Sequence, residues 1–177
     1  MSPTTMVYEL SLATGQTLYM VVISTLFAAL IGLPLGTALF SSHGVKPYPK
    51  LFHFLSSVIN ITRSIPFIIL LVALIPITRF LIGTSIGIHA AIVPLTLGTA
   101  PFFARLVDNA YRNLPNGLVE AGFAMGANTW QLIRYILFPE ACPALVQALT
   151  VTAITLVNYS AMAGTVGGGG LGDLAIR

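Results

Sequence analysis

The sequence predicts an all-α integral membrane protein with about four transmembrane helices. Hydrophobic residues make up 56% of the 177 residues and charged residues only 7%, and the mean hydropathy is +0.91. Soluble proteins carry roughly a quarter charged residues, so this composition excludes that class. A second observation is the spacing of the charges, because most uncharged intervals reach the ~20 residues that a helix needs to cross a bilayer. These intervals are Leu10–Val45, Ser64–Thr78, Phe80–Ala104 and Ala141–Gly172.

The first predicted span, Thr17–Phe40, lies inside the longest uncharged interval. No basic region precedes it and its apolar run is too long for a cleaved signal, so we expect it to be retained. The second span, Ser57–Thr78, is expected to be kinked by Pro66 and Pro76. Arg63 is expected near its polar end. Backbone groups freed by kinks need protein or water partners, which is typical of a helix that lines a pathway. The remaining predicted spans are Ser85–Ala104 and Pro143–Gly164.

Basic residues are distributed unequally between the two sides of this arrangement. Because lysine and arginine concentrate on the cytoplasmic side of membrane proteins, we expect the N-terminus outside. We also expect residues 1–177 to form a single transmembrane domain. One side carries Lys46, Lys50, Arg63, Arg105, Arg112 and Arg134, and the other carries Arg79 and Arg177.

The long inner segment, about 105–140, is too polar to cross the membrane and too periodic to be disordered. Its apolar residues recur with helical spacing, so two short amphipathic helices are expected. The first repeat consists of Leu118, Ala121, Gly122 and Met125, and the second of Ile133, Ile136 and Leu137.

Four residues in this segment have expected roles at the helix ends. Asn116 is the expected N-cap of the first helix, and Glu120 in its opening turn suits the positive helix end. Gly126 is expected to turn the chain between the helices. Pro139 is expected to stop the second helix.

Patterns for nucleotide and metal chemistry are missing from the sequence. A phosphate-binding loop ends in Lys followed by Ser or Thr, whereas Lys46 and Lys50 are followed by proline and leucine. We therefore expect no ATP hydrolysis by this chain. The histidines show no i, i+4 pairing, and Cys142 is a lone cysteine expected to pack inertly. No metal, disulfide or nucleic-acid site is expected.

The predicted spans also contain no Asp, Glu, Lys or Arg well away from an end. Proton-coupled carriers usually relay protons through buried ionisable groups, so this pattern weighs against a secondary transporter.

The segment Glu120-Ala121-Gly122, followed by Gly126, Ile136 and Pro139, resembles the EAA loop of bacterial ABC importer permeases. Gly122 departs from the usual Ala or Ser, and Phe138 replaces the usual Leu. Glycine at position 122 is expected to destabilise the first helix by up to ~1 kcal/mol relative to alanine.

The methionine importer permeases are the branch that the sequence resembles most. The resemblance covers essentially the whole chain, most densely from Asn60 to Gly172. Relatives continue into a further span, so the chain is expected to lack the last span. The motifs are Arg63–Leu71, Ala91–Thr96, Tyr159–Met162 and Gly167–Gly170 followed by Leu171-Gly172.

The resemblance implies that the inner loop docks into a groove on an ATPase. Glu120 would make a polar contact or cap, Ala121 and Gly122 would allow close approach, and Gly126 would turn the chain. Taken alone, Glu120 would be an ordinary solvated carboxylate. Leu118 and Met125 could pack under their own subunit or contact the partner. The implied coupling residues are Glu120, Ala121, Gly122, Met125, Gly126, Ile136 and Pro139.

Candidate pathway or gate residues lie near the end of the last predicted span. Met162 has small neighbours and could plug a narrow opening, although ordinary helix packing explains it as well. Asn60, Asn158 and Tyr159 could line the pathway or tie helices together. Gly167–Gly170 is expected to be a flexible outer turn that lets backbones approach. The candidate gate residues are Met162, Ser160, Tyr159 and Asn158.

The resemblance further implies a bacterial inner-membrane permease for D- or L-methionine that works by alternating access. The implied partners are a pair of ATPase subunits, which bind ATP and Mg²⁺, a second permease copy in a homodimer, and an outer substrate-binding protein. Lipid surrounds the spans, and no cofactor is bound by the chain itself. The alternatives are a permease for another amino acid or small organic solute, an ATPase-independent channel or carrier, and a nonfunctional remnant.

Overall fold

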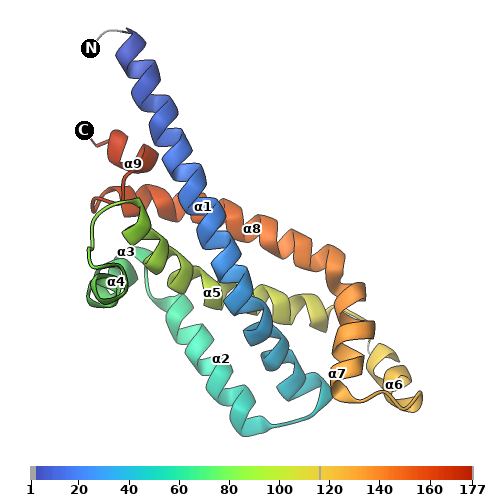
Figure 1. Ribbon diagram of the computed structural model, residues 1–177. Helices are drawn as coiled ribbons and strands as arrows, with labels where there is room; N and C mark the ends of the chain where they lie inside the picture. The colour runs from blue at the N-terminus through green and yellow to red at the C-terminus, as the bar shows by residue number, and fades with distance from the viewer. Residues whose placement is uncertain (1–2, 116, 177) are drawn as a thin grey trace.

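The computed structural model describes residues 3–115 and 117–176, and the regular elements in these ranges are all helices (Figure 1). Both ends of the chain lie at one end of the molecule, and α6 and α7 lie at the other (Figure 1). The elements are α1 (Pro3–Phe40), the π-helix η1 (Ser41–Val45), α2 (Pro49–Ser64), α3 (Phe67–Ala73), α4 (Ile75–Ile82), α5 (Ile88–Arg112), α6 (Gly117–Ala124), α7 (Thr129–Gln131), the π-helix η2 (Leu132–Leu137), α8 (Phe138–Gly164) and α9 (Gly170–Leu174).

The predicted all-α membrane class is confirmed. Three helical stretches are long and apolar enough to cross a membrane, and the number rises to four if the bent pair α2 and α3 counts as one span. The long stretches are Thr4–Val45, Ile88–Arg112 and Thr129–Gly164.

Helices α1 and α5 cross at close range because two glycines of α1 leave room for the α5 backbone. A Cβ on Gly32 would lie 2.8 Å from the carbonyl oxygen of Ala100, and a Cβ on Gly36 would meet the carbonyl of Ala104. Small residues four positions apart form this kind of interface between membrane helices. The pair Gly32 and Gly36 therefore positions the centre of the bundle.

The second predicted span is not one kinked helix, which corrects the sequence analysis. Helices α2 and α3 are bent by 103° at their junction. Ile65 is extended, with φ −80° and ψ 126°, because a residue before proline is disfavoured in the helical region. The chain then breaks again at Leu74, where Pro76 enters the first turn of α4. Two prolines thus convert one span into three short helices.

The third span is longer than predicted at its C-terminal end, and the fourth at its N-terminal end. Helix α5 continues to Arg112, into the segment assigned to the inner loop. At the fourth span, Pro139 does not stop the helix, because it occupies the first turn of α8, directly after η2. The wide π-turn shifts the hydrogen-bond register, so a residue without an N–H is accommodated there.

Candidate functional site

Helix α6 packs against η2 at the end of the molecule away from the chain termini (Figure 1), and Gly122 makes this contact possible. Gly122 is buried, and a Cβ at this position would meet the end of the Leu132 side chain and lie 3.0 Å from Cδ1 of Ile136. Glycine at this position therefore does more than lower helix propensity, since it brings two short helices together.

A tight turn joins α6 to α7. Gly126 has φ +80°, the left-handed conformation that favours glycine, so the predicted turn is present. Asn128 then caps α7: its Oδ1 accepts from the Gln131 N–H at 2.9 Å, and its own N–H donates to Oε1 of Gln131 at 2.9 Å. Sequence reasoning missed this capping box, although the Asn-x-x-Gln spacing resembles its signature. Asn116, the predicted N-cap, lies outside the described residues.

The residues assigned to coupling divide into two groups. Gly122 and Ile136 hold α6 on η2, with Ile136 half-buried, whereas Glu120, Ala121 and Pro139 are exposed. Leu118 packs against the buried cluster of its own chain. Met125, in contrast, is 75% exposed, so its apolar side chain is available to a partner.

An ion cluster at the inner end of α5 was missed because these residues were assigned to a loop. Asp108 is fully buried and accepts from Arg105 Nη1 and Arg112 Nε, each at 3.0 Å. Arg105 Nη2 also donates to Ser56 Oγ and Asn60 Oδ1 on α2, each at 2.9 Å. The spacing of these charges, three and four residues apart, places them on one helix face.

This cluster joins α2 to α5. The guanidinium of Arg112 lies 5.8 Å from the ring centroid of Phe52, also on α2. Asn60 therefore ties helices together, which was one of its two predicted roles. We refer to Arg105, Asp108 and Arg112 as the α5 ion cluster.

The candidate gate residues of α8 do not share one environment. Ser160 is buried and its hydroxyl donates to the Val157 carbonyl at 2.7 Å, so it bonds within its own helix. Tyr159 stacks on Phe67 of α3, with ring centroids 4.3 Å apart and an interplanar angle of 3°. Asn158 and Met162 are exposed, Met162 at 43%. Tyr159 is thus the member of this group that faces a neighbouring helix.

The glycine run after α8 forms a turn that packs against α1 and against the end of α8. The N–H of Gly170 donates to Oε1 of Gln16 at 3.0 Å, and the N–H of Leu171 donates to Oγ1 of Thr17 at 2.9 Å. A Cβ on Gly168 would lie 2.7 Å from the carbonyl oxygen of Ala163. The expected close approach of backbones is present.

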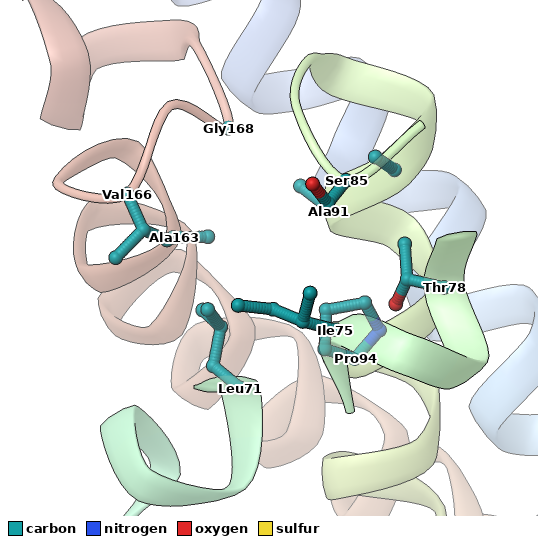
Figure 2. Close-up of a pocket in the computed structure, with 10 residues that line it drawn as sticks. Leu71, Ile75, Thr78, Ser85, Ala91, Pro94, Ala163, Val166 and Gly168 are labelled. Atoms are coloured by element: carbon teal, nitrogen blue, oxygen red, sulfur yellow. The ribbon is translucent and has the colours of Figure 1, made fainter. Parts of the chain in front are cut away.

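A small cavity lies at this end, between α3, α4, α5 and the turn that follows α8 (Figure 2). In Figure 2, Leu71, Ile75 and Val166 surround it with mainly apolar atoms. Its volume is about 20 Å³, close to the minimum that holds one water molecule. This cavity therefore cannot hold a transported solute.

A larger cavity of about 200 Å³ lies beside the break between α2 and α3. Its walls come from α2, α3, α5 and α8. Of the candidate gate residues, Tyr159 alone lines it. The sequence analysis expected this kinked segment to line a pathway, but it did not predict the cavity.

The described residues contain no group of three or more His, Cys, Asp or Glu side chains that could hold a metal ion. Cys142 is exposed on α8, which corrects the expectation that it packs inside the protein.

A family model described as "Binding-protein-dependent transport system inner membrane component" matches residues 28–177. A Vibrio cholerae protein named "Probable D-methionine transport system permease protein MetI" is 53% identical over 93% of this chain and 74% of its own length. The Escherichia coli K12 protein named "D-methionine transport system permease protein MetI" is 54% identical over 84% of this chain and 70% of its own length.

Solved structures resemble the whole described fold. A chain from "Inward facing conformations of the MetNI methionine ABC transporter" superposes with a TM-score of 0.95 at 51% identity, covering 99% of this chain and 82% of that one. A chain from "Crystal structure of an amino acid ABC transporter with histidines" gives a TM-score of 0.78 at 22% identity, covering 99% and 81%. Because this second chain is only 22% identical, its similarity shows a shared fold alone.

Proposed function

Because the chain belongs to the binding-protein-dependent transport system inner membrane component family, we propose that it is the permease subunit of an ABC importer for methionine. The observation that carries this proposal is the TM-score of 0.95 at 51% identity with a chain of the methionine transporter MetNI. The curated relatives named as D-methionine permeases support the same substrate.

The permease supplies the pathway and a separate ATPase supplies the energy. The ATPase pair binds ATP and Mg²⁺, closes, and displaces the loop from Glu120 to Pro139. The helices then rock so that the central cavity opens to the other side. No covalent chemistry occurs on this chain. The exposed Glu120 and Ala121 on α6, and Met125 in the turn that follows it, support this docking role, because a helix can present such a face to a groove.

The assembly contains a second permease copy, since a two-fold pair encloses a pathway between identical faces. A substrate-binding protein delivers methionine at the outer end, where both chain ends lie (Figure 1). The N-terminus is outside, and α6 and α7 face the cytoplasm. This orientation is supported by the basic residues at the inner end, among them Lys46, Arg112 and Arg134.

The test is uptake of labelled methionine into proteoliposomes that contain this chain, its ATPase and its binding protein. We expect uptake that requires ATP and both partners and that excess unlabelled methionine blocks. The Escherichia coli relative with its own partners is the positive control.

A competition panel of other amino acids distinguishes the substrate from the transport class. Inhibition by another amino acid but not by methionine would reject the substrate and keep the importer. Uptake that persists without the ATPase would reject the importer itself.

A further inference from the structure

The break between α2 and α3 creates an unusual site inside a membrane-spanning segment. Pro66 has no N–H, so the carbonyl of Thr62 receives no helical bond from it and accepts only the long 3.4 Å bond from Ile65 N. Thr62 also lines the 200 Å³ cavity. The cavity therefore has a polar acceptor with spare capacity on one wall.

Aromatic rings form the rest of the lining. Phe67 and Tyr159 stack face to face at 4.3 Å, and Phe102 lies opposite the end of α2. Gly98 allows this crowding, since a Cβ there would lie 3.0 Å from Leu70 and 3.3 Å from Phe67. Sulfur atoms pack well against aromatic rings. The full lining is Thr62, Arg63, Ile65, Phe67, Leu70, Gly98, Phe102 and Tyr159.

Arg63 brings a positive charge to this cavity. Its guanidinium lies 5.4 Å from the ring centroid of Phe102. The salt bridges in the described part of the chain both involve Asp108, which pairs with Arg105 and Arg112, so Arg63 has no carboxylate partner there. Arg63 was expected near the polar end of its span, but it lies at the break inside the bent pair of α2 and α3. An arginine within a spanning segment usually pairs with an acidic group or marks a substrate path.

We propose that this cavity holds the amino acid in transit, with Arg63 binding its carboxylate and the stacked rings of Phe67 and Tyr159 contacting its thioether side chain. The Thr62 carbonyl accepts from its ammonium group. This inference rests on the proposed function and adds to it a substrate site within the permease. The volume, below the ~300–1,000 Å³ of pockets for drug-sized ligands, suits a single amino acid.

The guanidinium fits this role because it presents a planar fork of N–H donors to a carboxylate. The broken helix fits it as well, since interrupted helices expose backbone groups to substrates in other transporters. Arg63 at the end of α2 would also suit the negative helix end, and the experiment separates these two roles.

The experiment uses a methionine analogue that carries a diazirine in place of the sulfur. On irradiation the diazirine loses N₂ and inserts into a neighbouring bond. The whole transporter, with ATPase and binding protein, is labelled in proteoliposomes at an analogue concentration that fully competes with methionine uptake. Mass spectrometry then locates the label. We expect it on peptides that contain Thr62–Leu70, Gly98–Phe102 or Tyr159, and excess methionine should remove it.

The key variant is Arg63→Gln, and its matched control is Arg79→Gln on α4. Both remove one exposed arginine, but Arg79 does not line the cavity. We expect Arg63→Gln to lower labelling and to raise the KM for uptake by about tenfold or more, the effect of losing a charge-assisted hydrogen bond. Arg63→Lys should have a KM between those of Arg63→Gln and wild type. ATP hydrolysis stimulated by the binding protein should persist in every variant.

Each alternative result has a distinct meaning. Label that lies elsewhere while wild-type uptake proceeds would overturn this site and leave the proposed function intact. An unchanged KM in Arg63→Gln would also overturn this site. So would a loss of ATP hydrolysis in Arg63→Gln that matches its loss of uptake, because that result indicates a structural role for Arg63. Absence of methionine uptake by the wild-type transporter would overturn the proposed function itself.

Discussion

Asp108 shows how one buried carboxylate can hold two helices together. It is fully buried and pairs with two arginines of α5, both of which contact α2. Removing one partner from a buried ion pair leaves uncompensated charge, which costs about 3–5 kcal/mol.

We expect Asp108→Asn to lower the free energy of unfolding in mixed micelles by about this amount. Arg112→Gln should lower the free energy of unfolding by less than Asp108→Asn does. The Arg112 side chain is 36% exposed, compared with 16% for Arg105 and 0% for Asp108, and solvent screens the more exposed charge. Glu140→Gln, on an exposed carboxylate, is the control. Equal stability of Asp108→Asn and wild type would show that the cluster does not stabilise the bundle.

Two glycines of α1 offer a matched comparison at the same scale. A Cβ on Gly36 would meet the backbone of α5, whereas nothing lies within 4 Å of a Cβ on Gly15. We expect Gly36→Ala to destabilise the protein by about 1–3 kcal/mol through overpacking. Gly15→Ala should be neutral or stabilising by up to ~1 kcal/mol, since alanine favours helix. Denaturant unfolding of both variants and of wild type measures the change in the free energy of unfolding. Effects of the same sign in the two variants would argue against a close contact between α1 and α5 at Gly36.

At the scale of elements, α6 and η2 form a small platform at the inner end. Its inward contacts are made by Gly122 and Ile136 and its outward face by Glu120 and Met125. This division separates the residues that shape the platform from those that a partner can reach.

Charge reversal at Glu120 tests the outward face. We expect Glu120→Lys to reduce co-purification of the ATPase by at least about tenfold, as reversing one partner of an interfacial charge pair does. ATP-driven uptake should fall in parallel. Glu140→Lys is a matched control, because Glu140 is also an exposed first-turn carboxylate. Loss of the ATPase in both variants would point to a general charge effect instead of docking through Glu120.

The sequence predicted some elements well and others badly, for physical reasons. The apolar runs that became α1, α5 and α8 were identified because length and hydropathy are local properties. The span after Lys50 was wrong because propensity does not say whether a proline kinks a helix or ends it. Asp108 was misplaced because its charge suggested a loop, and its neutralisation by Arg105 and Arg112 depends on a helix that the pattern did not predict.

At the scale of the whole molecule, the cavity beside Arg63 could not be found from sequence. Its walls come from α2, α3, α5 and α8, and no local sequence pattern shows that α5 and α8 meet the break between α2 and α3. The residues assigned to coupling came from a family resemblance, and the structure adds how Gly122 and Gly126 shape the turn that presents them. Their contact with an ATPase stays a prediction.

The orientation of the molecule gives a prediction at this scale. In a Cys142→Ser background, we expect a membrane-impermeant maleimide to label Thr84→Cys in intact spheroplasts, because Thr84 lies in the exposed turn after α4. Asn113→Cys, at the C-cap of α5, should react only after the membrane is permeabilised. The reverse pattern of labelling would mean that the N-terminus is inside.

The hydrogen bonds from Gly170 and Leu171 to α1 also bear on how the protein is made. Each joins residues 154 positions apart. A ribosome adding roughly 5–20 residues per second needs about 8–30 s to supply these donors after Gln16 and Thr17 emerge. Helix α5, which packs on Gly32 and Gly36, is synthesised much earlier. The contacts between α1 and α5 can therefore form first, and the turn after α8 can bond to α1 only once Gly170 and Leu171 have been made.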